Sequence, residues 1–263
     1  MGFQTQHVPS VAGAETRYLD LVERVLLDEV HGGEGRAERW MRIAALRVRH
    51  PWLTRDWRQA WPARAHTMIS RARLGHLRRL VEATLREGVA GDYIETGVWR
   101  GGACILMRAV LAAYGVRDRT VVVADSFSGL PRPDTARYPA DKHDTLSRFS
   151  ELAVSEDEVR RNFGAYGLLD DQVFFLKGLF KDTLPSMRER RFALIRLDGD
   201  MYESTMDALA NLYDGLSPGG YAVIDDYGVL GVCRQAVHDF LDARGLTPVI
   251  EPVDDSAVWW RKD

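Results

Sequence analysis

Cysteine is scarce in this sequence, which contains only Cys104 and Cys233, far apart along the chain. Two isolated cysteines provide neither a disulfide framework nor the ligand spacing of a zinc site. Long hydrophobic runs are missing as well. No segment approaches the roughly 18 uncharged apolar residues of a membrane-spanning helix, and the N-terminus lacks a basic start followed by an apolar stretch. We therefore expect a cytoplasmic protein without a membrane partner.

An excess of charge of one sign is also lacking. The sequence has 35 lysines and arginines against 38 aspartates and glutamates, which leaves a net charge of −3. This balance provides no broad basic surface, so we expect no nucleic-acid partner. The local basic group formed by Arg71, Arg73, Arg78 and Arg79 is typical of a solvated helix face.

The 263 residues, 46% of them hydrophobic, suffice for one large α/β domain with an appendage. Apolar residues at helical spacing from Tyr18 to Val30 predict an N-terminal helix. A proline-interrupted region follows that carries four tryptophans, Trp40, Trp52, Trp57 and Trp61. We predict an N-terminal helical cover or lid over residues 1–70, packed on a cofactor cleft, on its own domain or on a second subunit, and the main domain over residues 71–263.

The stretch from Gly91 to Ile105 predicts a short buried strand, a glycine turn and the start of a helix. A dinucleotide-binding turn would need glycine at position 99, where this chain has Trp99, so a pyrophosphate and a dehydrogenase activity are disfavoured. Glu95, two residues before Gly97, suits a cofactor with a positive ammonium or sulfonium group and no phosphate. S-adenosylmethionine fits that description, while an ordinary strand-to-helix turn is the alternative.

Strands and helices alternate from Tyr93 onward, which is the pattern of a parallel sheet with helices on both faces. The second predicted strand, residues 120–126, carries Asp125 at its end, where an acidic residue accepts ribose hydroxyls in nucleoside-binding folds. A loop-side N-cap is the alternative role for Asp125. Further strands are predicted at residues 172–177, 192–197 and 221–224, and residues 247–253 and 257–261 predict a terminal antiparallel hairpin.

Three carboxylates follow the fourth and fifth predicted strands, namely Asp198, Asp225 and Asp226. If these strands are neighbours, the carboxylates meet at the carboxyl edge of the sheet, where open α/β folds bind ligands. Hard oxygen ligands suit Mg²⁺, and Mn²⁺ is chemically allowed. Gathered without a basic partner, the carboxylates would repel one another, so we expect a cation there.

Simple helix capping is the alternative role for such carboxylates, and we assign it to Asp200. With Glu203 three residues later, Asp200 makes an acidic capping box for the next helix. Ser155 and Glu158 predict a second capping box. Ahead of Ser155, the long polar loop from Gly129 to about Val154 predicts a mobile lid near the substrate, in which His143 is a minor candidate for direct chemistry.

Six motifs, in order along the chain, resemble the macrocin O-methyltransferase family. They are Ala65-His66-Thr67-Met68-Ile69, Glu95-Thr96-Gly97-Val98-Trp99-Arg100-Gly101-Gly102, Ala124-Asp125-Ser126-Phe127, Gly178-Leu179-Phe180-Lys181-Asp182-Thr183, Asp198-Gly199-Asp200 and Ile224-Asp225-Asp226-Tyr227. The resemblance implies the Rossmann-like α/β fold of class I methyltransferases. It also implies an enzyme that methylates sugar hydroxyls of bacterial natural products with S-adenosylmethionine and Mg²⁺.

Carried over to this chain, the resemblance assigns a role to each motif. It makes Asp198, Asp225 and Asp226 the metal ligands, and Asp198 also the general base. It implies that the cofactor is bound by Thr67 and Met68, which close over it, by Glu95 and Gly97 at its methionine half, by Asp125 at its ribose, by Ser126 and Phe180 near its adenosine, and by Gly178.

Within the family, the chain resembles the aminocoumarin branch, which methylates the 4-hydroxyl of noviose on a glycosylated coumarin in novobiocin-type antibiotic biosynthesis. The resemblance therefore implies a noviosyl coumarin as acceptor, with a macrolide deoxysugar as the main rival. A catechol-type methyltransferase acting on a phenol and a non-catalytic cofactor-binding protein stay open as alternatives. We also expect a homodimer.

Overall fold

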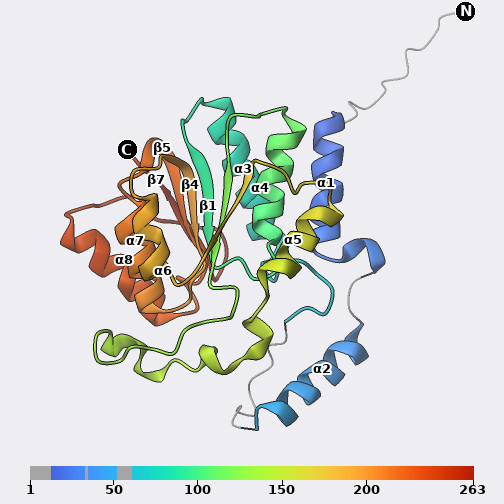
Figure 1. The fold of residues 1–263 in the computed structure, drawn as a ribbon, viewed down its shortest axis with the longest axis vertical. Coiled ribbons are helices and arrows are strands. Elements are labelled where there is room, and N and C mark those ends of the chain that lie inside the picture. The colour runs from blue at the N-terminus through green and yellow to red at the C-terminus, as the bar shows by residue number, and fades with distance from the viewer. Residues whose placement is uncertain (1–12, 33–34, 52–60) are drawn as a thin grey trace, which may run out of the picture.

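The computed structural model describes residues 13–32, 35–51 and 61–263. Its centre is a sheet of seven strands in the order β3-β2-β1-β4-β5-β7-β6 (Figure 1). Strands β1 to β5 are parallel, and β7 pairs antiparallel with both β5 and β6. The strands are β1 Asp92–Thr96, β2 Val121–Asp125, β3 Val173–Lys177, β4 Phe192–Leu197, β5 Leu216–Ile224, β6 Glu251–Pro252 and β7 Val258–Arg261. The predicted parallel sheet with a terminal hairpin is thus confirmed.

Two strands differ from the prediction by more than one residue at an end. Strand β5 begins at Leu216, ahead of the predicted residue 221, because a register shift against β4 accommodates the Pro218-Gly219-Gly220 segment within the strand. Strand β6 contains only two residues of the predicted 247–253. Prolines and glycines normally end strands, so local patterns place these boundaries poorly.

Helices cover both faces of the sheet (Figure 1). One core joins the sheet to α1 Ala14–Leu26, α3 Arg71–Arg86, α4 Gly102–Ala113 and α5 Glu156–Ala165. A second core, on the opposite face, joins it to α7 Tyr202–Leu212 and α8 Gly231–Ala243. Alternate side chains of one strand enter different cores: in β1, Tyr93 belongs to the first and Ile94 to the second.

The remaining elements are short, apart from α2 Arg36–Arg49, which extends away from the sheet (Figure 1). They are η1 Glu29–His31, η2 Pro139–His143, η3 Leu146–Arg148, η4 Ser150–Leu152, α6 Phe180–Thr183 and η5 Leu184–Met187. Helix α1 shares the first core with α3 and α4, and the division at residue 70 stays a prediction. Trp52 and Trp57 lie outside the described residues.

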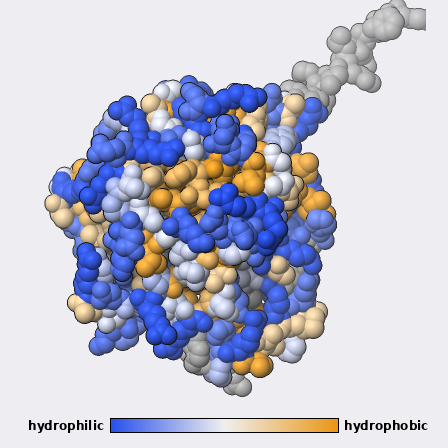
Figure 2. Space-filling view, viewed as in Figure 1, coloured by the Kyte–Doolittle hydropathy of each residue, from blue (hydrophilic) through white to orange (hydrophobic). Residues whose placement is uncertain are grey.

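The surface is mixed in character. On the face shown in Figure 2, hydrophilic residues cover most of the area and hydrophobic residues gather near its upper middle. Across the three described ranges, no helix has both the length and the apolar character that crossing a membrane requires.

The predicted cap at Ser155 is confirmed, because the Ser155 hydroxyl accepts a hydrogen bond from the Glu158 N–H at 3.2 Å. The predicted cap at Asp200 is wrong. Helix α7 begins after Met201, and its first N–H groups are bound by Asp141 of η2, which accepts from Tyr202 at 2.8 Å and from Glu203 at 3.0 Å. Asp141 is almost fully buried although it belongs to the long polar loop.

Replacing Asp141 by alanine leaves the first N–H groups of α7 unpaired in a buried position. We expect Asp141→Ala to lower the free energy of unfolding by about 1–2 kcal/mol, measured by chemical denaturation. Ser155→Ala is the matched control, since it removes an ordinary cap from α5 and should cost about 1 kcal/mol. Unfolding of Asp141→Ala at the wild-type denaturant midpoint would contradict the capping role.

Candidate active site

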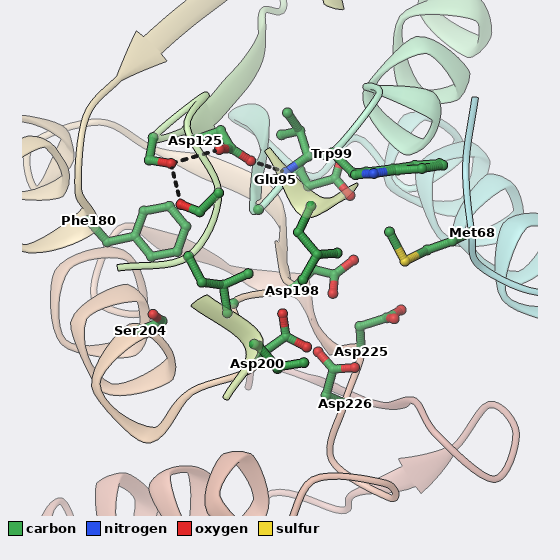
Figure 3. A pocket seen from close by; sticks show the side chains of 18 of the residues that line it. Met68, Glu95, Trp99, Asp125, Phe180, Asp198, Asp200, Ser204, Asp225 and Asp226 are labelled. Atoms are coloured by element: carbon green, nitrogen blue, oxygen red, sulfur yellow. Dashed lines mark hydrogen bonds between the residues drawn. The ribbon is translucent and has the colours of Figure 1, made fainter. Parts of the chain in front are cut away.

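A cavity of about 580 Å³ opens beyond the carboxyl ends of the parallel strands (Figure 3). His143 is not among the residues that line it. All the residues that the family resemblance assigns to the site line this cavity: Thr67, Met68, Glu95, Gly97, Asp125, Ser126, Gly178, Phe180, Asp198, Asp225 and Asp226. The structure therefore brings the predicted cofactor residues and the predicted metal ligands together.

The turn after β1 requires glycine at Gly97. Its φ angle is 86°, and a Cβ atom added there would lie 1.8 Å from the carbonyl oxygen of Asp198. The neighbouring Trp99 also has a positive φ, 47°, which is unusual for a bulky residue. Its indole N–H donates to the carbonyl of Glu151 at 3.0 Å, and the Arg100 guanidinium lies 4.3 Å from its ring centre. Trp99 thus connects the glycine turn to the long loop.

Asp125, at the end of β2, holds two backbone segments in place. Its carboxylate accepts from the N–H of Val98 at 2.8 Å and from the N–H of Phe127 at 2.7 Å. The Ser126 hydroxyl donates to the carbonyl of Gly129 at 2.7 Å. These bonds stabilise a turn and a loop and do not cap the start of α4, so the alternative role of Asp125 as a loop-side N-cap is not observed, and ribose binding stays a prediction.

Arg196 of β4 lies among three of the predicted carboxylates, and its side chain is only 2% exposed. One of its terminal nitrogens donates to Glu95 and, at 2.7 Å, to Asp198, and the other donates to Asp225. The Cys104 thiol donates to the second oxygen of Glu95 at 2.9 Å. Burial raises the pKa of Glu95 to about 7 against the attraction of Arg196.

A second arginine approaches from α3. Arg73 donates to the other carboxylate oxygen of Asp225 and lies 3.2 Å from the carboxylate of Asp254. The expectation that the carboxylates gather without a basic partner is therefore wrong. Asp198 directly follows β4 and stands two residues after Arg196, so alternation along the strand directs both side chains to the same face of the sheet. This spacing is the sequence signal that could have indicated the pair.

The carboxylates of Asp198, Asp225 and Asp226 can each offer one oxygen within 4.8 Å of the others. The Asp226 Oδ2 atom is buried and finds no hydrogen-bond partner in the described part of the chain. Burial, together with the charges of Asp200 and Asp198, raises the pKa of Asp226 well above its usual range. Converging carboxylate oxygens with one orphaned buried atom fit a small hard divalent cation such as Mg²⁺.

Asp200 is an addition to the predicted site. Because Asp141 caps α7, Asp200 does not serve as the helix cap. It adopts a left-handed backbone with a φ angle of 61° and lies beside Asp198 and Asp226 (Figure 3). Burial and the nearby charge of Asp198 raise its pKa well above the usual range. Among the described residues Asp200 makes no ion pair, in contrast to Asp198 and Asp225.

The long loop contributes one wall of the cavity. Its lining residues are mainly apolar and come from both ends of the loop: Gly129, Leu130, Pro131, Arg132, Leu146 and Leu152. The predicted position near the substrate agrees with this wall, and mobility of the loop stays a prediction.

Comparison with known proteins identifies relatives over the full described domain. A model of the macrocin-O-methyltransferase (TylF) family matches residues 15–262. The mycinamicin III 3''-O-methyltransferase of Micromonospora griseorubida is 46% identical over 248 residues, which cover 93% of this chain and 96% of the relative. The demethyldecarbamoylnovobiocin O-methyltransferase of Streptomyces niveus is 46% identical over 247 residues, 93% of each chain.

A solved structure is similar throughout. The O-methyltransferase NovP superposes with a TM-score of 0.83 at 45% sequence identity, over 94% of this chain and 99% of NovP. Together, the profile match and these identities show that the chain belongs to the macrocin O-methyltransferase family.

Proposed function

We propose that this enzyme transfers the methyl group of S-adenosylmethionine to a hydroxyl of a deoxysugar on a glycosylated natural product, with the help of Mg²⁺. The observation that carries the proposal is that the glycine turn with Glu95 and the carboxylates of Asp198, Asp225 and Asp226 open into one cavity. A positively charged methyl donor and a hydroxyl held near a cation can then meet inside it. Family membership supports the methyl transfer.

S-adenosylmethionine brings its own reactive methyl group, so the cofactor residues need only bind and orient it. Glu95 would face the cationic methionine half, and Gly97 lets the backbone approach closely. Asp125 would accept the ribose hydroxyls with the acceptor capacity left by its two backbone bonds. The other proposed contacts are Thr67, Met68, Ser126, Gly178 and Phe180.

Asp198, Asp225 and Asp226 would hold the Mg²⁺ ion, and Mn²⁺ suits the same oxygens. When bound, the ion would acidify a sugar hydroxyl and fix its direction. The protein's own contribution is orientation, which in well-aligned systems accounts for about 7–11 kcal/mol of a reaction barrier.

We propose two carboxylates as candidates to accept the proton that the sugar hydroxyl loses. Asp198 is the predicted base, but its Oδ2 already accepts a hydrogen bond from Arg196 at 2.7 Å, which leaves its other oxygen for the proposed metal ion. Asp200 lines the same cavity and forms no ion pair among the described residues. The ion pair at Asp198, which Asp200 lacks among the described residues, therefore favours Asp200 as the proton acceptor and Asp198 as a metal ligand.

The acceptor is proposed from the relatives. The two enzymes at 46% identity are named for a macrolide, mycinamicin III, and for demethyldecarbamoylnovobiocin, so overall identity does not separate these acceptors. We keep a noviosyl coumarin, methylated at its 4-hydroxyl, as the first candidate and a macrolide glycoside as the second.

A homodimer is also proposed, because three large apolar side chains of α2, Trp40, Met41 and Val48, are exposed by 58–82%. Such side chains favour burial against another surface.

We also propose a cytoplasmic location for the protein.

Methyl transfer from labelled S-adenosylmethionine tests the function. The acceptors are a desmethyl noviosyl coumarin, a desmethyl macrolide glycoside and a catechol, each with Mg²⁺ and with EDTA. We expect turnover of a glycoside, a fall to background in EDTA and recovery on adding Mg²⁺. Turnover of the catechol alone would overturn the sugar acceptor, and turnover of a glycoside that EDTA leaves unchanged would overturn the role of the metal.

Two substitutions separate metal binding from proton transfer. We expect Asp200→Asn to lower the rate of methyl transfer by about 10²–10⁴-fold, as for other general bases, while Mg²⁺ affinity changes only a few fold. Asp198→Asn should lower both, with cofactor affinity kept within a few fold. Calorimetric Mg²⁺ titration and single-turnover rates measure these effects. A fully active Asp200→Asn variant would return the role of base to Asp198.

A further inference from the structure

Arg196 occupies an unusual place for an arginine, in the interior of a central parallel strand. It is paired with Glu95 across β1 and β4, so the two side chains project from adjacent positions on neighbouring strands. Asp198 follows two residues later, just beyond the end of β4, and Asp225 follows the end of β5. One guanidinium thus contacts carboxylates that come from three adjacent strands.

Burial of this group depends on its partners. A charged side chain with 2% exposure is stable only when it is paired and hydrogen-bonded, and Arg196 achieves this with three carboxylates. The guanidinium is planar and rigid, so its N–H groups fix the positions of the carboxylate oxygens that accept hydrogen bonds from them. Among the three partners, Asp198 and Asp225 are the proposed metal ligands, and Glu95 lies outside that set.

We infer that Arg196 is the positioning residue of the metal site: its planar guanidinium fixes the carboxylates of Asp198 and Asp225 in an arrangement that suits a small cation and favours Mg²⁺ over Ca²⁺. This inference rests on the proposed function. Glu95 completes the arrangement from the other side, because it holds the guanidinium through one oxygen and is itself held by the Cys104 thiol through the other.

Cation selectivity follows from rigidity. Mg²⁺ demands nearly octahedral geometry with short bonds, whereas Ca²⁺ accepts more ligands in flexible arrangements. Partners that orient metal ligands typically account for about 10–100-fold in metal affinity. Loosening the guanidinium therefore weakens Mg²⁺ binding more than Ca²⁺ binding, even though no ligand is changed.

The test is calorimetric titration of the full chain with Mg²⁺ and, separately, with Ca²⁺, without cofactor or acceptor. Arg196→Lys keeps the charge but loses the planar fork. Glu95→Gln leaves every proposed ligand intact and changes the carboxylate that holds Arg196 from the neighbouring strand, and the titration without cofactor excludes its proposed role in cofactor binding. We expect Arg196→Lys to weaken Mg²⁺ binding by about 10-fold or more and to lower the Mg²⁺/Ca²⁺ affinity ratio at least about threefold, with a smaller shift in the same direction for Glu95→Gln.

Arg108→Lys is the matched control. Arg108 is also a buried arginine that contacts both oxygens of one carboxylate, that of Asp170, but it lies outside the cavity lining. Its substitution should lower stability and leave the Mg²⁺/Ca²⁺ ratio within about twofold of the wild type. A purely structural role of Arg196 predicts the same behaviour for Arg196→Lys.

The outcomes separate the inference from the proposed function. Wild-type protein that binds neither cation would overturn the metal part of the proposed function, and the inference with it. Wild-type protein that binds Mg²⁺, with an unchanged ratio in both Arg196→Lys and Glu95→Gln, would overturn the inference alone. If Arg196→Lys does not fold, as judged by circular dichroism, the Mg²⁺/Ca²⁺ affinity ratio of Glu95→Gln decides the inference: a lowered ratio supports it and an unchanged ratio overturns it.

Discussion

A fully buried guanidinium and the three carboxylates that contact it stabilise one another. Removing either the positive or the negative partner would leave an uncompensated charge away from water. Arg196 provides this centre at the carboxyl edge of the sheet, and Arg73 adds a second positive charge on Asp225. Asp226 and Asp200 lie beyond their direct reach and retain strongly raised pKa values. The two arginines therefore compensate only part of the negative charge at this edge of the sheet, and the remaining carboxylates are the basis for the proposed cation.

The loops around the cavity are also anchored near the carboxyl edge of the sheet. The long loop is attached to opposite walls, through Asp141 at the start of α7 and through the Glu151 carbonyl at Trp99. The Glu151 side chain additionally lies 2.9 Å from Arg49, at the end of α2. These attachments come from segments on both sides of the site, so the loop, the glycine turn and the acidic segment are positioned together. Excluding water from such a space strengthens every electrostatic interaction inside it.

Much of this arrangement could be predicted from the sequence. Alternating strands and helices predict the parallel sheet, and the topological rule for such sheets predicts that residues after β1, β2, β4 and β5 share one edge. Asp125, Asp198, Asp225 and Asp226 were found in this way. The family motifs added Thr67 and Met68, which precede the sheet and follow no strand.

The rest depends on contacts that local patterns do not contain. The spacing from Asp200 to Glu203 predicts a cap at Asp200. The residue that caps α7, Asp141, lies about 60 residues earlier in the chain and contacts the helix only in the folded protein. The position of Arg196 on the same face of the sheet as Asp198 could be predicted from the two-residue spacing between them. Its role as counter-charge required knowledge that β1, β4 and β5 are neighbours.

The proposed metal site is tested most directly by a crystal structure with S-adenosylhomocysteine and Mn²⁺, collected at a wavelength where manganese scatters anomalously. We expect one strong anomalous peak within bonding distance of Asp198, Asp225 and Asp226, with the methionine half of the cofactor beside Glu95. No peak at these carboxylates, or a peak elsewhere in the cavity, would contradict it.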